Sequence, residues 1–320
     1  MHPLVARIHP ALRTALTAWL LSRVVIWSAA SGKSMEVRDG TALAGLVGGF
    51  VDGAAAAVPQ GLATQLVAFS PWILLEVLVL LAGIAVYRFA RSTELPQFAE
   101  RACWLWFFNP VLAITAGQWG AQMAAACGAL AIAYIATYRP RRAIAAALVA
   151  TGCRLEFLLL WPAFAFAAWR HRHDPRHSRA TLALSFGAIP LGFALWIGAA
   201  IYFAGSAHIS MRAVHQDMAL RHSLFPGTTA LLELAVVIAV TVAALICLTR
   251  LRHFPLWYSL AALPALGWAL AMSPATTAAI TTAWALPVFV YLACATDDRS
   301  LERPLLLAMA LAFCGAAFGL

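Results

Sequence analysis

Residues 104–138 read WLWFFNPVLAITAGQWGAQMAAACGALAIAYIATY, and this stretch decides how the rest of the chain is arranged. It is almost wholly apolar and lies between Arg101 and Arg139. As one straight helix it would extend ~50 Å, at ~1.5 Å per residue, well beyond the ~30 Å hydrocarbon core of a bilayer. Because positive residues favour the cytoplasmic side, both ends are expected on one face and the turn at 117–120 on the other. The stretch therefore predicts a hairpin of two helices.

The composition indicates a polytopic membrane protein. Hydrophobic residues make up 63% of the 320 residues and charged residues 11%, and the mean hydropathy is +0.82, values that exclude a soluble globular fold. The formal net charge of +9 does not indicate nucleic-acid binding, because the positive residues form short clusters between apolar runs. The six cysteines lie in apolar runs without metal-binding spacing, so neither disulfides nor a cysteine metal site is expected.

Apolar runs separated by charge predict an all-α polytopic membrane fold with about 11 membrane segments in one domain over residues 1–320. Arginine bounds residues 143–169 at both ends, and Arg154 and Glu156 interrupt their middle, so this stretch is expected to form a second hairpin. The first segment is expected to be retained and not cleaved as a signal peptide. The expected segments are 14–31, 70–87, 103–116, 119–138, the two short helices within 143–169, and 181–204, 228–248, 255–272, 276–294 and 304–320, with long outer loops at 32–68 and 205–226.

Positive charge assigns the two sides of this topology. With a cytoplasmic N-terminus in a plasma or bacterial inner membrane, 16 of the 22 lysines and arginines fall on the cytoplasmic side. The other six lie within spans or on the outer side, where each needs a physical reason; they are Arg23, Lys33, Arg38, Arg154, Arg212 and Arg221. Glu76 is expected near a helix start, where its charge favours the helix dipole.

Six stretches, taken in chain order, resemble the GT-C superfamily of membrane glycosyltransferases. NPVLAITAGQWGAQ resembles its third and fourth helices with their outer turn. The others resemble the PIG-V type (GPI mannosyltransferase II) family and its bacterial relatives: LLSRVVIW with Arg23, VRDGTALAGLVGGFVDG with Asp39, ATGCRLEF with Arg154, GSAHISMRAVHQDMALRHSLFPG with Gln216 and Arg221, and ALPVFVYLA. The resemblance implies an inverting transferase that moves a sugar, mannose in that family, from a polyprenyl-phosphate donor to a lipid or glycolipid acceptor at the outer face.

The predicted site residues have distinct roles, and several have a simpler alternative. Asp39 would be the general base for the acceptor hydroxyl, with Asp52 as a competitor and a solvated turn aspartate as the alternative. Arg154, Arg212 and Arg221 would bind the phosphate, unless they are solvated or, for Arg154, neutralised by Glu156. Gln118 and Gln122 would contact sugar hydroxyls or satisfy backbone groups of the turn. Arg23, Glu156 and Gln216 complete the predicted substrate-binding set.

No metal site is predicted, and the requirement for a divalent cation is left open. Among four arginines, His171, His173 and His177 are expected to form a basic interfacial loop. His208, His215 and His222 are expected to form a polar face over a cavity. The lipid bilayer and the two lipid-linked substrates are the predicted partners, nucleic acid is not expected, and the sequence identifies no protein partner.

Departures from the family pattern support two alternatives. Arg38 precedes Asp39, and Ala42 and Leu43 stand where the family has Trp and Tyr. Thr281 and Thr282 lie where the family has a late arginine. These losses favour a non-catalytic relative that binds polyprenyl lipids or supports a membrane complex. A transporter is the other alternative, because short hairpins with intramembrane Arg and Glu also occur there.

Overall fold

The computed structural model describes ten parts of the chain, and every regular element within them is a helix. These parts are residues 9–30, 54, 62–93, 96–109, 112–113, 119–137, 139–173, 178–204, 286–295 and 299–318. The all-α fold class is confirmed for them. The expected segments 228–248 and 255–272 and the outer loop 205–226 lie outside the described residues, as does the outer loop 32–68 up to residue 61, apart from residue 54.

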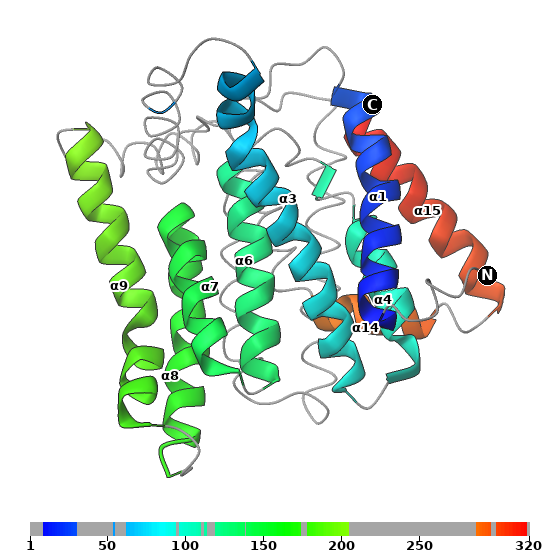
Figure 1. The fold of residues 1–320 in the computed structure, drawn as a ribbon. Helices are drawn as coiled ribbons and strands as arrows, with labels where there is room; N and C mark the ends of the chain where they lie inside the picture. The colour runs from blue at the N-terminus through cyan, green and yellow to red at the C-terminus, as the bar shows by residue number, and fades with distance from the viewer. Residues whose placement is uncertain are drawn as a thin grey trace, which may run out of the picture.

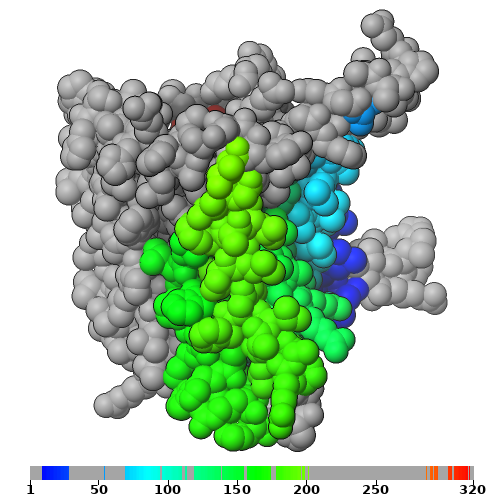
Figure 2. Space-filling model, turned by 90° about the vertical axis from the view of Figure 1, so that its left-hand side faces the viewer, coloured from blue at the N-terminus to red at the C-terminus, as the bar shows by residue number. Residues whose placement is uncertain are grey.

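Six of the described helices form a row across the molecule (Figure 1). The row runs α9 (Arg179–Ala204), α7 (Pro140–Cys153), α6 (Trp119–Ala136), α3 (Leu62–Arg91), α1 (Pro10–Ala30) and α15 (Arg299–Phe318), and each helix contacts the next. The shorter helices α4 (Ala99–Phe107) and α14 (Leu286–Ala295) pack against each other and against α3. Viewed from the α9 end of the row, α9 lies over the helices behind it (Figure 2).

The stretch 104–138 folds back, as its length predicts. α4 ends at Phe107, where the backbone N–H of Asn109 donates to Trp106 O at 3.3 Å. The next long helix, α6, begins at Trp119 and packs along α3 and α7. Residues from the end of α3 and from just after α6 line one cavity, so the chain returns to the side it left. The fold-back is confirmed, but the first helix spans Ala99–Phe107 and not the expected 103–116, and residues 110–111 and 114–118 lie outside the described part of the chain.

The second hairpin is also confirmed. α7 begins with Pro140. Proline suits this position because the backbone N–H that it lacks would have no partner within the helix. It ends at Cys153, and Arg154 follows in an extended conformation with φ −141° and ψ 124°. A short 3-10 helix, η3 (Leu155–Leu160), leads into α8 (Trp161–Arg170). Pro140 and His171 line the same cavity, so α8 brings the chain back to the starting side of α7.

α1 has large apolar side chains outside and small or polar ones inside. Leu12, Leu16, Leu20 and Val24 recur every fourth residue and are exposed. The opposite face is buried and consists of Ala11, Thr14, Ala15, Ala18, Ser22, Arg23 and Ile26. A helix on the surface of a soluble protein has the reverse distribution.

α6 is the most enclosed helix of the row. Every residue from Trp119 to Ala133 is buried, and most of them are Ala or Gly, whose small side chains let neighbouring helices approach closely. Two described helices are long and apolar enough to cross a membrane by length and composition, and these are Phe69–Arg91 within α3 and Trp119–Ala136.

A close contact between α3 and α4 depends on Gly83. A Cβ atom at Gly83 would overlap Cε2 and Cζ of the Phe107 ring, which is itself fully buried. Gly187 in α9 is the matched control, because a Cβ atom there meets nothing within 4 Å.

We expect Gly83→Ala to destabilise the protein by about 1–3 kcal/mol through overpacking. Gly187→Ala should be neutral or stabilising by up to about 1 kcal/mol, because alanine favours helix over glycine. Thermal unfolding in detergent, followed by tryptophan fluorescence, measures both. Adding Phe107→Leu, which removes the overlapping ring atoms, should recover part of the loss in Gly83→Ala. Equal melting temperatures for the two alanine variants would contradict this account.

Candidate functional site

A buried ion pair joins α1 to α3. Arg23 Nε donates a hydrogen bond to Glu76 Oε2 at 2.6 Å, and Trp19 Nε1 donates to the same oxygen at 2.7 Å. The two charged side chains are 7% and 15% exposed. We call these three residues the Arg23 cluster. The pairing with Glu76 explains how the positive charge of Arg23 is accommodated inside the first helix.

The local sequence explains why this cluster forms. Trp19 and Arg23 are one helical turn apart, so both point from the same face of α1 toward Glu76. Ala11, Ala15 and Ala18 lie on the same side and are almost fully buried, so α1 lies close against its neighbours α3 and α4. Close approach brings the tryptophan and arginine donors within reach of a single carboxylate oxygen.

The cluster lies near the middle of both helices. Arg23 follows Arg13 by about 10 residues, or ~15 Å of helix, and Glu76 precedes Arg88 by about 12 residues, or ~18 Å. Either charge alone would be costly at that depth in hydrocarbon, whereas a hydrogen-bonded pair is tolerated. Within the described part of the chain, Arg23 Nη2 is buried and has no hydrogen-bond partner. That donor remains available to a water or to a ligand oxygen.

Glu76 lies deeper in its helix than the sequence predicts. α3 begins at Leu62, not near residue 70, so Glu76 lies more than three turns inside the helix and cannot act on the helix dipole. The sequence does contain a hint of this pairing. Glu76 and Arg23 are the only charged residues in their expected segments, 70–87 and 14–31. Two opposite charges at similar depth should be paired.

The turn before α6 is stabilised by side chains. Gln122 is buried, and its Nε2 donates to Leu112 O at 3.2 Å. Trp119 Nε1 donates to Pro71 O at 2.9 Å and so ties the start of α6 to α3. Gln122 therefore satisfies a backbone carbonyl of the turn, which was one of its two predicted roles.

Arg154 lies at the break between α7 and η3. Its backbone N–H donates to Ala150 O at 3.0 Å, and its carbonyl accepts from Phe157 N at 3.2 Å. The side chain is partly exposed. α6 and α7 pack against each other and run in opposite directions (Figure 1). Arg154 follows the last residue of α7 and therefore lies at the level where α6 begins.

The structure does not bring Arg23 and Arg154 to one helix interface. α1 packs against α3, α4 and α15, whereas α7 packs against α6, α9 and η3. α3 and α6 stand between them in the row (Figure 1). Among the predicted site residues that the structure describes, Gln122 lies at the same level of the helices as Arg154.

The remaining predicted site residues fall outside what the structure describes. The backbone of Glu156 lies in η3, but its side chain is not among the described ones. The other five are Asp39, Gln118, Arg212, Gln216 and Arg221, and their roles stay predictions.

The described histidines belong to the arginine-rich side of the molecule. Arg172 Nε donates to His173 Nε2 at 2.9 Å, and the Arg172 guanidinium lies 4.5 Å from the centre of the Trp169 ring. In the described residues, no group of three or more His, Cys, Asp or Glu side chains has a metal-binding arrangement.

We expect Glu76→Leu alone to cost about 3–5 kcal/mol, because it leaves the Arg23 charge buried without its partner. Combining it with Arg23→Met should recover most of that loss, so the two changes will be strongly non-additive. Glu100→Leu on α4 is the control, since Glu100 is exposed. Unfolding free energies in detergent, arranged as a double-mutant cycle, measure the coupling. Additive losses would show that the pair does not act as a unit.

Comparisons of the chain with family models, with curated proteins and with solved structures found no match. The likeness to GT-C transferases therefore rests on the order of the motifs in the sequence.

Proposed function

We propose that this chain is a polytopic membrane glycosyltransferase of GT-C type. It would transfer a sugar, mannose by resemblance, from a polyprenyl-phosphate donor to a lipid or glycolipid acceptor at the outer face. The observation that carries the proposal is the break at Arg154. There, a helix is interrupted at an arginine within the motif ATGCRLEF. The break lies on the opposite side of the molecule from the arginines at the ends of α3 and α6.

The distribution of side chains supports a membrane location. Large exposed apolar residues occur on helices at both ends and in the middle of the row, for example Trp27 on α1, Ile73 on α3, Leu195 on α9 and Leu311 on α15. So many large exposed apolar side chains are expected where helices contact lipid or a partner. The charged pair Arg23 and Glu76 points inward, as charges in membrane helices do.

The position of Arg154 suits a lipid phosphate. The side chain is partly exposed, and its extended backbone places it between two helices instead of within one. A guanidinium can donate two parallel hydrogen bonds to phosphate oxygens. Positive charge at this end runs against the cytoplasmic bias, so a ligand requirement explains its presence.

The chemistry follows from these roles. Asp39 accepts the proton of the acceptor hydroxyl as its oxygen attacks the anomeric carbon of the sugar. The bond between that carbon and the phosphate oxygen breaks, and the electron pair leaves with polyprenyl phosphate. Arg154 and Arg221 stabilise the departing negative charge. Attack opposite the leaving group inverts the anomeric centre.

The Arg23 cluster favours a second candidate, a non-catalytic relative that binds polyprenyl lipid. In the family-derived prediction Arg23 contacts substrate, but here its charge is already balanced by Glu76. With Ala42 and Leu43 in place of the family's Trp and Tyr, such a protein would still have the helices and Arg154 to bind a lipid phosphate, but it would not transfer the sugar.

Transfer from radiolabelled polyprenyl-phosphate sugars in proteoliposomes tests the proposal, with a lipid extract as acceptor and with Mg²⁺, Mn²⁺ and EDTA arms. We expect Asp39→Asn to lower the rate about 10²–10⁴-fold through loss of the general base. Arg154→Gln should lower it about 10²–10³-fold. Arg170→Gln, an exposed arginine at the end of α8, is the matched control and should leave the rate unchanged.

Binding of labelled polyprenyl phosphate separates the two candidates. Binding without transfer from any donor would favour the non-catalytic relative. Full activity of Asp39→Asn would remove Asp39 as the base. Neither binding nor transfer by a folded protein would overturn both candidates.

A further inference from the structure

A basic cavity lies where α3 and α6 end, on the opposite side of the molecule from Arg154. Its volume is about 390 Å³, within the usual range for small-ligand sites. Both ionisable and aromatic side chains line it, from the end of α3, the end of α6, the segment between α6 and α7, and the residue before α1. They are Arg88, Arg91 and Arg139, together with His9, Tyr87 and Tyr134.

The charge in this cavity is unbalanced within the described structure. No described carboxylate forms an ion pair with Arg88, Arg91 or Arg139. The C-terminal ends of α3 and α6 also face this region, and each contributes about half a negative charge. Together they offset about one of the three arginines, so a site of net positive charge remains. An anion would relieve the mutual repulsion of the guanidinium groups.

The arginine side chains match a phosphate group better than a carboxylate. Three guanidinium groups supply more donors than two carboxylate oxygens can accept, whereas a phosphoryl group offers more acceptor sites in a tetrahedral arrangement. Arg142 adds positive charge nearby, since its guanidinium lies 5.9 Å from the centre of the Tyr134 ring.

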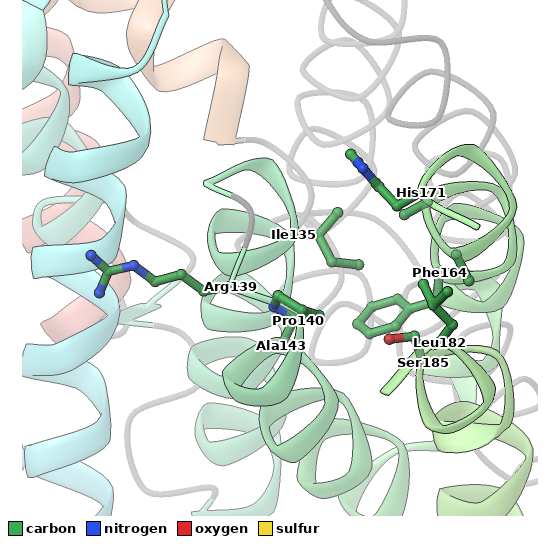
Figure 3. A pocket seen from close by; sticks show the side chains of 10 residues that line it. Ile135, Arg139, Pro140, Ala143, Phe164, His171, Leu182 and Ser185 are labelled. Carbon is green, nitrogen blue, oxygen red and sulfur yellow. The ribbon is translucent and has the colours of Figure 1, made fainter. Parts of the chain in front are cut away.

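Arg139 lies between this cavity and a second, apolar one. Its stem lines a slot of about 40 Å³ with Ile135, Phe164 and Leu182. Figure 3 shows its guanidinium pointing away from Phe164 and Leu182, toward α3. The slot is too small for a lipid chain. The polar cavity therefore suits the head of a lipid, and this slot does not take its hydrocarbon chain.

We propose that this cavity binds the phosphate of an anionic phospholipid headgroup. The cavity lies at the ends of α3 and α6, the two described helices that are long and apolar enough to cross a membrane. The ends of such helices lie at the level of the lipid headgroups. Basic pockets between membrane helices bind anionic headgroups by this chemistry. The proposal rests on the membrane location and not on sugar transfer.

Native mass spectrometry of the full chain, released from nanodiscs of defined lipid, tests this. The probes are phosphatidylglycerol and phosphatidylcholine, with inorganic phosphate and glycerol phosphate as soluble competitors. We expect retention of phosphatidylglycerol over phosphatidylcholine. Each arginine should contribute about fivefold in affinity, so combining Arg88→Gln, Arg91→Gln and Arg139→Gln should weaken binding about 100-fold.

The matched control removes three exposed arginines outside the cavity and so changes the net charge equally. Arg141→Gln, Arg170→Gln and Arg179→Gln together should change phosphatidylglycerol affinity less than about threefold, because these arginines do not line the cavity and act on a headgroup there only through the screened surface field. Thr137→Trp fills the cavity without changing charge and should also abolish preferential retention, which keeps the test valid if the cavity triple variant does not fold.

Three outcomes would overturn the proposal. The first is equal retention of phosphatidylcholine and phosphatidylglycerol. The second is an equal loss in the two triple variants, which would indicate a general surface charge effect. The third is binding of inorganic phosphate as tightly as of the lipid, which would assign the cavity to a soluble anion. Sugar transfer measured in parallel distinguishes these failures from failure of the transferase proposal.

Discussion

A buried charge needs a partner, and Glu76 supplies one for Arg23 in the Arg23 cluster. Arg23 and Trp19 on α1 both donate to one oxygen of Glu76 on α3. The pair is satisfied only when α1 lies against α3 in one register. α3 in turn contacts α4 and α6, so the register of the first two helices is passed to the hairpin that follows.

Helix packing beyond this pair depends on small side chains. α6 is buried from Trp119 to Ala133 and consists largely of Ala and Gly, so α3 and α7 approach it from opposite sides. With no hydrophobic driving force between helices in lipid, such close packing and polar contacts hold them together. One polar contact is the hydrogen bond from Trp119 to Pro71. One close contact is that of Gly83 with Phe107.

The described part of the chain has two chemically different ends. One carries Arg88, Arg91 and Arg139 around a cavity, and the other carries Arg154 and the turn before α6. The first end follows the usual bias of positive charge and suits lipid headgroups. The second has Arg154 at a helix break, where we propose a phosphate ligand.

The sequence by itself determined that the described part of the chain is helical and that it folds back within residues 104–138 and 143–169. Apolar length, bounded by arginines, predicted both hairpins, because a run longer than a bilayer with like charges at its ends must return. The partner of Arg23 and the separation of Arg23 from Arg154 came only from the tertiary structure. Glu76 is 53 residues from Arg23 in sequence, and their contact depends on how α1 and α3 pack. Hydropathy records the depth of a residue along its helix, whereas pairing across helices depends on rotation and neighbours, which only packing decides.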